Sequence, residues 1–374
     1  TRQRHIDLPR IDDQHVLLPT LLALISAPYL VIGILMLVYG RKQTLRKDYS
    51  YRRTVTVFVP TYNEEKYIAR KLGNLLAQTY PISEILIYDC STDNTAKLVR
   101  ETQERHPSIR LVTVPEEMTM AQILNRALRE AKGEIVVKTD CDSLAESRDA
   151  LKELVADFAD PRVGGVTGVC VAQRGLEKHF RALLTRLQIA ESNIDSVIIA
   201  HASSLLAFRR SAATPVSPDS MADDTEEFVL IRRKGYRTIV DAQVISQEEQ
   251  PRTFSERRTQ KDRRAQGIAR ALIQNIGILF RPRYKGYGFV VYPANLFLLA
   301  VSPLLLMVGA ALFVCYLLLA SSPLLLLGTA AASMLIFAMA RGVVFAAVDA
   351  QVSGLIATAR LAFGMNQAKW QRIR

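Results

Sequence analysis

The chain has 374 residues, enough for one large domain or two smaller ones, and 49% of them are hydrophobic. Its four cysteines are widely spaced and form no Cys-x-x-Cys pair, which excludes a disulfide framework and a cysteine zinc site. The formal net charge is +12, but much of the basic excess flanks apolar stretches and no basic run is interleaved with aromatic residues, so we expect no nucleic-acid partner.

The first element in the chain is an apolar stretch that predicts a membrane span. Residues 16–39 contain no charged side chain over 24 positions, and a helix needs roughly 20 apolar residues to cross a bilayer core. The stretch is too long for a signal peptide and no Ala-x-Ala-like cleavage site follows it, so we expect a retained anchor. We predict an extracytoplasmic segment over residues 1–15 and a transmembrane helix over residues 16–40; the alternative is a buried core helix.

Strand and helix patterns alternate after this anchor. Apolar β-branched runs predict strands, and helical spacing of apolar residues predicts helices. The predicted strands are 54–59, 84–89, 109–114, 134–140, a pair within 163–173, 205–210 and 237–245; the predicted helices are 64–78, 90–106, 120–131, 149–158 and 175–194. Such alternation is typical of a parallel sheet with crossover helices. We therefore expect residues 41–253 to form one α/β domain with a Rossmann-like, mostly parallel sheet.

Polar side chains follow three of the predicted strands. They are Pro60, Tyr62 and Glu64 after the first strand, Asp89 after the second, and Asp140 and Asp142 after the fourth. Ligands of parallel sheets bind beyond the carboxyl ends of the strands, so we expect these side chains to meet at one edge. Asp140 and Asp142 offer the paired carboxylates that hold Mg²⁺ or Mn²⁺ together with substrate phosphates. The alternative is that the pair caps the next helix.

Two charged clusters lie farther along the chain. The first contains Asp223, Asp224, Glu226 and Glu227, which cannot all be buried and ionised together. It either begins a helix, whose N-terminus favours acidic side chains, or supplies a general base. The second, residues 255–267, is basic. It is either a surface helix near a membrane or a clamp for a diphosphate, for which arginine is well suited.

The basic cluster runs into a pattern that predicts an interfacial helix. Apolar residues recur at helical spacing over 268–279, and we expect Tyr284, Tyr287 and Tyr292 to form an aromatic belt at the membrane surface. The alternative is a helix that packs on the α/β domain. We assign residues 254–287 to a basic clamp and interfacial helix.

A second uncharged region predicts two further spans. Residues 286–340 contain no charged side chain over 55 positions, which predicts transmembrane helices at 288–320 and 323–348 and a membrane-proximal tail over 349–374. Basic residues crowd the exit of the first span and return in the tail. The positive-inside rule then places the N-terminus outside, and the α/β domain and tail in the cytoplasm. We expect a multi-pass protein of the cell membrane whose α/β domain faces the cytoplasm.

Six segments match a known family in combination. They are VPTYNEE (59–65), DCSTDNT (89–95), AQILNRALREAKGE (121–134), TDCDS (139–143), ADDTEE (222–227) and QKDRRAQG (260–267). With the flanking apolar stretches, they resemble the membrane-bound family-2 glycosyltransferases, the group of cellulose synthase and hyaluronan synthase. This resemblance covers roughly residues 54–270 and the predicted spans.

The resemblance implies an inverting transferase of GT-A fold that uses a nucleotide sugar and Mg²⁺ or Mn²⁺. Carried over to this sequence, Asp142 and Asp140 hold the metal, and Asp224 deprotonates the acceptor hydroxyl, with Asp223 or Glu226 as alternative bases. His201 and Asp223 fall on the acceptor side. The implied donor-binding residues are Asp89 at the nucleobase, Asp140 at the ribose and phosphates, Gln260, Arg263 and Arg264 at the diphosphate, and Pro60, Tyr62 and Glu64 in the opening turn.

Two positions depart from the family pattern. Met120 stands where the family usually has a basic residue, and Arg264 replaces the Trp of Gln-x-x-Arg-Trp, which stacks on the growing chain in processive members. With only three predicted spans, this favours transfer of one sugar to a lipid-linked acceptor. By a loose likeness to small archaeal and bacterial lipid-directed mannosyltransferases, we expect mannose from GDP-mannose, for glycolipid or N-glycan precursor synthesis. The alternatives are a UDP-sugar-dependent transferase, a processive polysaccharide synthase and an inactive nucleotide-binding scaffold.

Overall fold

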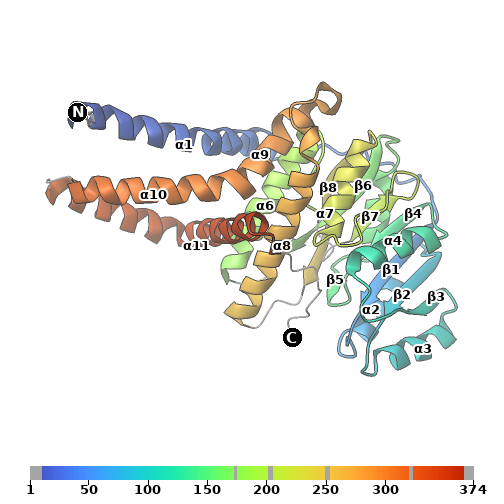
Figure 1. Cartoon of the computed structure of the whole chain (residues 1–374). Helices are drawn as coiled ribbons and strands as arrows, with labels where there is room; N and C mark the ends of the chain where they lie inside the picture. The colour runs from blue at the N-terminus through green and yellow to red at the C-terminus, as the bar shows by residue number, and fades with distance from the viewer. Residues whose placement is uncertain (1–10, 172–174, 201–204, 249–252, 320–322, 366–374) are drawn as a thin grey trace, which may run out of the picture.

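An α/β domain carries three long helices that extend together on one side (Figure 1). The computed structural model describes residues 11–171, 175–200, 205–248, 253–319 and 323–365. The extending helices are α1 (Ile11–Tyr39), α10 (Ser302–Leu319) and α11 (Pro323–Ala362). Because α1 contacts α10 and α10 contacts α11, apolar segments from opposite ends of the chain lie side by side.

Within the described residues, eight strands form one sheet in the order β3-β2-β1-β4-β7-β6-β8-β5. They are β1 (Val55–Thr61), β2 (Glu84–Asp89), β3 (Ile109–Thr113), β4 (Ile135–Lys138), β5 (Ser143–Ala145), β6 (Val163–Val171), β7 (Leu206–Arg209) and β8 (Arg237–Glu248). The four strands β3, β2, β1 and β4 pair in parallel, as the alternating pattern predicts. However, β7 is antiparallel to β4 and β6, and β5 is antiparallel to β8. The sheet is therefore mixed rather than mostly parallel.

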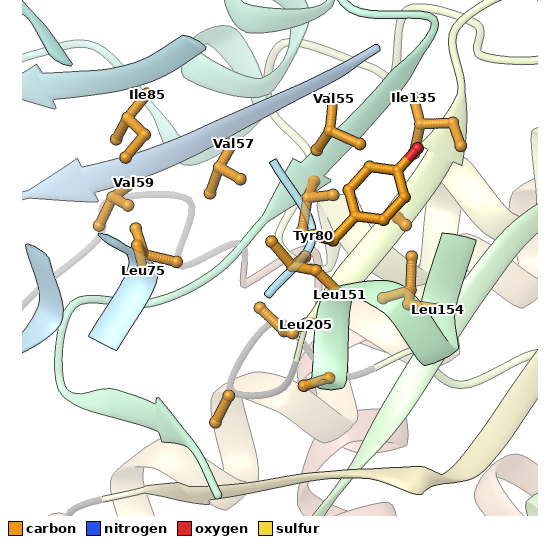
Figure 2. Close-up of a cluster of buried hydrophobic side chains, with 14 of the residues drawn as sticks. Val55, Val57, Val59, Leu75, Tyr80, Ile85, Ile135, Leu151, Leu154 and Leu205 are labelled. Atoms are coloured by element: carbon orange, nitrogen blue, oxygen red, sulfur yellow. The ribbon is translucent and has the colours of Figure 1, made fainter. Parts of the chain in front are cut away.

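Apolar side chains alternate between the two faces of the parallel strands and fill two cores. In β1, Val55, Val57 and Val59 belong to one core, whereas Phe58 belongs to the other. Figure 2 shows the first core, with the three valines of β1, Leu75 and Leu151 among its labelled side chains. The helices that complete the domain are α2 (Ile68–Leu76), α3 (Thr95–Arg105), α4 (Met120–Glu130), α5 (Ala150–Asp157), α6 (Gly175–Ile194), α7 (Asp223–Arg233) and α8 (Phe254–Gln274). The period of two in the sequence thus decides which face each side chain joins.

The prediction of a strand pair within 163–173 is wrong, because β6 is one continuous strand through Val171. The pairing of β6 with β8 is irregular around Gly164 and Gly168, and two of the glycines also allow close packing. A Cβ added at Gly164 would lie 2.7 Å from Tyr236 Cβ, and one added at Gly165 would lie 2.8 Å from Phe228 Cε1. These glycines let α7, which carries Phe228, approach the sheet closely.

One helical segment in the described part of the chain, Tyr287–Val314, is long and apolar enough to cross a membrane. It runs through η3 (Tyr287–Val291), α9 (Tyr292–Leu296) and η4 (Phe297–Val301) into α10. Ile25–Tyr39 is a shorter apolar helix. The prediction of three spans is therefore not confirmed.

The predicted tyrosine belt is wrong. Tyr284, Tyr287 and Tyr292 are buried in a core with Leu272 of α8, and the Tyr292 hydroxyl donates to the Leu272 carbonyl at 2.5 Å. The guanidinium of Arg232 lies over the rings of Tyr284 and Tyr287, 5.8 and 5.5 Å from their centroids. These phenol rings fill the junction between the α/β domain and the apolar segment rather than facing outward.

Helix α11 is longer than a bilayer core is thick, and it packs against α8. A helix of 40 residues is about 60 Å long, roughly twice the thickness of a bilayer core. Asp349 of α11 is buried and pairs with Arg258 Nη1 and Lys261 Nζ of α8, both at 2.9 Å. Because α8 carries the predicted diphosphate clamp, these ion pairs join the clamp helix to α11.

A buried charged cluster fastens the segment after α1 to the domain. Lys47 Nζ lies 2.6 Å from Glu153 Oε2 and 2.6 Å from Asp241 Oδ2. Asp157 is also buried there. Burial first, and then the negative charge of Asp241, raise the pKa of Asp157 to about 9, so this carboxyl is largely protonated at neutral pH.

We expect Asp157→Asn to stabilise the protein at alkaline pH. The folded state binds the Asp157 proton more tightly than the unfolded state, so stability falls as pH rises from the ordinary pKa of 3.8 to about 9. The neutral amide removes that loss. At pH 8.5 the melting temperature of Asp157→Asn should exceed that of the original protein by about 2–4 °C. A gain of ~1 kcal/mol gives a shift of this size in a domain of this length. The difference should shrink toward pH 5.

Thermal melts of both proteins between pH 5 and pH 8.5 check this expectation. Asp160→Asn is the matched control, since hydrogen bonding from Arg162 lowers the pKa of Asp160 and the substitution brings no gain with rising pH. An Asp157→Asn shift of the same size at every pH would contradict the assignment.

Candidate active site

The carboxyl ends of β1, β2 and β4 meet at one edge of the sheet, with Thr61 opposite Asp89 in register. The Thr61 hydroxyl donates to Asp89 Oδ1 at 2.7 Å, and the Ser91 hydroxyl donates to the same oxygen at 2.5 Å. Asp89 is buried. These two hydroxyls therefore fix its carboxylate at the end of the strand.

The turn after β1 is tied to the turn after β2. Asn63 has a φ of 55°, in the left-handed region where asparagine is enriched. Its N–H donates to Ser91 Oγ at 2.8 Å, and the Glu64 N–H donates to Thr95 Oγ1 at 2.8 Å. The opening turn is thus held against the loop that carries Asp89.

Asp140 and Asp142 follow β4 at this edge, and both side chains are half-buried. Cys141 between them is buried in the core that also contains Val137. The two carboxylates therefore flank an inward side chain. Burial raises the pKa of Asp140, and the ammonium of Lys138 opposes the rise.

An ion pair joins the start of α7 to the end of β4. Lys138 is buried, and its Nζ pairs with the carboxylate of Asp223. The neighbouring Asp224 is half-buried, and burial followed by the negative charge of Asp223 raises its pKa. The charge of Asp224 in turn raises the pKa of Asp140. Asp140 and Asp224, far apart in sequence, therefore lie at one site.

The other two acids of this cluster have partners before α7. Glu226 Oε1 accepts from the Ser217 N–H and Glu227 Oε1 accepts from the Thr214 N–H, both at 2.9 Å. Burial raises the pKa of Glu227 to about 8, so the four acids are not all ionised together at neutral pH. Glu226 and Glu227 hold the preceding loop.

Two arginines from different helices share one carboxylate beside these acids. Arg264 Nη2 lies 3.2 Å from Glu248 Oε1, and Arg181 Nη2 lies 3.0 Å from Glu248 Oε2. Burial works to raise the pKa of Glu248, but the two guanidiniums outweigh it and hold that pKa at about 2. The positive charge of Arg264 also opposes the rise in the pKa of Asp140 and of Asp224.

Gln260 of α8 neighbours both Arg263 and Arg264, because residues three and four positions apart are neighbours on a helix. Arg263 makes no hydrogen bond or ion pair with the residues that the structure describes. Burial, followed by the like charge of Arg264, lowers its pKa. An anion placed beside Asp140 would therefore meet a guanidinium that other described groups do not engage.

Gly267 sets the distance between α8 and the start of α7. A Cβ added there would lie 2.7 Å from both the backbone carbon and the oxygen of Met221, and 3.0 Å from Ala222 Cβ. Backbone atoms cannot move aside as a flexible side chain can. The absence of a side chain at Gly267 thus keeps the α8 arginines against Asp223 and Asp224.

The sequence between residues 52 and 267 matches the family model described as glycosyltransferase like family 2. This match covers more than half of the chain. The chain belongs to this family. It is therefore a glycosyltransferase, and its mixed sheet has the GT-A-like arrangement.

Among solved structures, the glycosyltransferase is similar to a mannosyltransferase from Pyrobaculum calidifontis, solved in complex with GDP-Man and Mn²⁺. The two are 30% identical with a TM-score of 0.78, over 93% of this chain and 99% of that one. It is also similar to poly-beta-1,6-N-acetyl-D-glucosamine synthases, with 34% identity over 116 residues in Staphylococcus aureus and 28% over 132 residues in Staphylococcus epidermidis. Those matches span only 28% and 32% of the synthases' own length.

The structure gathers most of the residues singled out from the sequence. Charge interactions connect a group of acids and arginines at the site, namely Asp140, Asp223, Asp224, Arg263 and Arg264. The opening turn and Asp89 lie along the same sheet edge, in the neighbouring strands. His201 lies outside the described residues, and Met120, the first residue of α4, packs against the second core.

Several residues around the site escape sequence analysis. Glu248, Arg181 and Gly267 have no local signal, because their partners lie on other elements. Lys138 does have one, since a single lysine ends the apolar run of β4 and a buried charge requires a partner. Its partner, Asp223, is visible only in the fold.

The donor set suits a divalent ion that is completed by a ligand. In the described ranges, no group of three or more His, Cys, Asp or Glu side chains could hold a metal by itself. Asp140 and Asp142 offer the one or two carboxylates that Mg²⁺ takes when substrate phosphates and water fill its other positions. These residues therefore fit a metal bound together with a diphosphate and do not form an all-protein cage.

Proposed function

We propose that this glycosyltransferase moves one mannose from GDP-mannose to a lipid-linked acceptor, with inversion at the anomeric carbon. The likeness to the mannosyltransferase from P. calidifontis carries the proposal, because it extends over nearly the whole of both chains and that protein was solved with GDP-Man and Mn²⁺. Such a transferase serves glycolipid or N-glycan precursor synthesis.

Asp224 is the base in this proposal. The carboxylate of Asp223 is engaged by Lys138, whereas burial raises the pKa of Asp224 and makes it a stronger base than an ordinary carboxylate. Asp224 takes the proton of the acceptor hydroxyl as that oxygen attacks the anomeric carbon. The new bond forms as the bond from that carbon to the diphosphate oxygen breaks, and the nucleoside diphosphate leaves.

The other predicted site residues bind the donor in this proposal. Asp89 binds the nucleobase, and Asp140 faces the ribose and phosphates. Pro60, Tyr62 and Glu64 line the opening turn, while Gln260, Arg263 and Arg264 gather the diphosphate. Mg²⁺ or Mn²⁺, when held by Asp142 and Asp140, neutralises charge on the departing diphosphate.

The acceptor is proposed to be lipid-linked because apolar surface continues from the candidate membrane segment toward α8. Ile273, Ile276, Phe280 and Phe289 are exposed near the start of Tyr287–Val314. Basic residues Arg281, Arg283 and Lys285 lie in the same stretch and would face anionic headgroups. The same proposal makes this chain a multi-pass protein of the cell membrane with the site on the cytoplasmic side.

A second candidate function is transfer from a UDP-sugar, including chain extension. The matches to poly-beta-1,6-N-acetyl-D-glucosamine synthases favour it, although they cover 30% and 35% of this chain. An inactive scaffold is less well supported, since Asp224 raises the pKa of Asp140 and Asp223 raises that of Asp224, a like-charge cost that a site without a bound cation has no reason to keep.

Membranes that contain the full chain, supplied with native lipid extract, test the proposal. We expect label from GDP-[¹⁴C]mannose to enter the organic phase as a single added sugar, and EDTA to abolish transfer until Mn²⁺ is restored. Labelled UDP-glucose and UDP-N-acetylglucosamine are the comparison donors. Preferred use of a UDP-sugar, or a long water-soluble product, would replace the mannose proposal with the second candidate.

A further inference from the structure

A buried lysine lies beneath the Asp140–Asp142 turn, and the proposed chemistry does not use it. Lys71 of α2 is 1% exposed. Its Nζ donates to Thr139 Oγ1 and to the Ser143 carbonyl, both at 2.6 Å. These two partners are the residues immediately before and after the Asp140-Cys141-Asp142 segment. The ammonium thus bridges both ends of the turn.

The same face of α2 continues this support along the chain. Asn74, three positions after Lys71, exchanges two hydrogen bonds with Ala145: its Nδ2 donates to the carbonyl at 2.9 Å, and its Oδ1 accepts from the N–H at 3.0 Å. Residues spaced by three or four positions share one side of a helix, so Lys71 and Asn74 of α2 together support residues 139–145. Gln78, two residues past the end of α2, accepts from the Leu151 N–H at 3.1 Å.

Backbone hydrogen bonds also hold the turn. The Thr139 N–H donates to the Phe58 carbonyl at 3.2 Å, and the Ser143 N–H donates to the Asp140 carbonyl at 3.4 Å. The first anchors the end of β4, the second lies within the turn itself, and Ser143 begins β5, which pairs with β8. Lys71 adds a side-chain link between the exit of the turn and its entry.

We propose that Lys71 is a positioning residue for the metal: it holds the Asp140–Asp142 turn in the conformation that binds a divalent cation. The inference rests on the proposed function, in which Asp142 and Asp140 are the ligands. Groups that orient metal ligands without touching the metal typically change its affinity by about 10- to 100-fold when they are removed.

The direction in which metal affinity changes when Lys71 is replaced distinguishes a positioning role from a purely electrostatic one. The ammonium of Lys71 is close enough to Asp140 and Asp142 for their charges to raise its pKa, although burial dominates and lowers that pKa to about 8. At pH 7 a cation therefore lies beneath a site for another cation. Loss of this charge alone would tighten metal binding, whereas loss of the positioned turn weakens it.

The test is the dissociation constant of Mn²⁺, measured at pH 7 from the electron paramagnetic resonance signal of free Mn²⁺ with GDP or UDP present. We expect Lys71→Met, which keeps the volume and removes the donors, to raise this constant by about 10- to 100-fold. Thr139→Val removes one acceptor and keeps the Lys71 charge, and we expect it to weaken Mn²⁺ binding as well. In the double variant, the loss of Mn²⁺-binding free energy should be smaller than the sum of the losses in the two single variants.

The controls separate this inference from the proposed function. Lys97→Met changes an exposed lysine on α3 and should leave the constant unchanged. Asp142→Ala should abolish binding. If it does and Lys71→Met binds Mn²⁺ equally or more tightly, Lys71 does not position the turn and the inference fails alone. If Asp142→Ala still binds Mn²⁺, the assignment of the metal ligands is wrong, and the inference about Lys71 is wrong as well. Should Lys71→Met not fold, unchanged binding by Thr139→Val overturns the inference.

Discussion

Asp224→Asn lowers kcat by about 10²- to 10⁴-fold, the contribution that a positioned general base makes. The amide keeps the shape of the carboxylate, and the N-terminus of α7 stays joined to β4 through Lys138 and Asp223. Donor binding should therefore change little. Transfer from labelled donor gives kcat, and titration with the nucleoside diphosphate gives the binding constant.

The pH profile supplies an independent measure of the same role. Burial and the charge of Asp223 raise the pKa of Asp224, and the base works only when ionised. The kcat of the original protein should accordingly fall as pH falls through that raised pKa, and Asp224→Asn should lose this limb.

A neighbouring acid serves as the control for the base. Asp219→Asn changes an exposed carboxylate that pairs with Arg270, and it should leave kcat within about twofold, as expected for a surface change outside the site. Full turnover by Asp224→Asn, with loss of turnover in Glu226→Gln, would move the base to Glu226.

Gly267→Ala lowers transfer by about 10²-fold, although the residue contacts no substrate in our proposal. The added Cβ would meet the Met221 backbone at 2.7 Å, so α8 must move away from α7. Arg263 and Arg264 lie one turn earlier on α8 and move with it. Displacements of about 1 Å at a reacting site cost this much rate because the aligned geometry is lost.

Donor KM and kcat, together with thermal melts, measure the effect of Gly267→Ala. We expect donor KM to rise and the protein to lose about 1–3 kcal/mol of stability, the usual cost of overpacking. Gly73→Ala is the matched control, because Gly73 is an exposed helical glycine with nothing within 4 Å of an added Cβ. It should keep full activity and gain about 0.5–1 kcal/mol. Equal activity of both variants would show that α8 tolerates the displacement.

Local patterns predict the parallel half of the fold well. Val55, Val57 and Val59 alternate with Phe58, and this period of two is a property of neighbouring residues alone. The apolar run of β4 ends at Lys138, with Asp140 and Asp142 directly after it, so the place of these carboxylates at the strand edge also follows from local order. The same argument places Asp89 at the end of β2.

Long-range partners explain the predictions that are wrong. Tyr284, Tyr287 and Tyr292 have the composition of an interfacial belt, but a core from α8 and the helices beside it encloses them. The glycines of β6 suggest two strands, but the strand is continuous, and Gly164 and Gly165 are also small because residues such as Tyr236 and Phe228 pack on them. Nothing within a few residues of either group reveals which element will cover it.

The sequence by itself determined the family, the alternating strands and helices, and the acids at the strand ends, because periodicity and strand termination act between near neighbours. Only the tertiary structure decided which acids meet. It paired Asp223 with Lys138, placed Glu248 between Arg181 and Arg264, and put Lys71 beneath the Asp140–Asp142 turn. These contacts join elements far apart in the chain, and the electrostatic and packing energies that select them arise only when the sheet and helices come together.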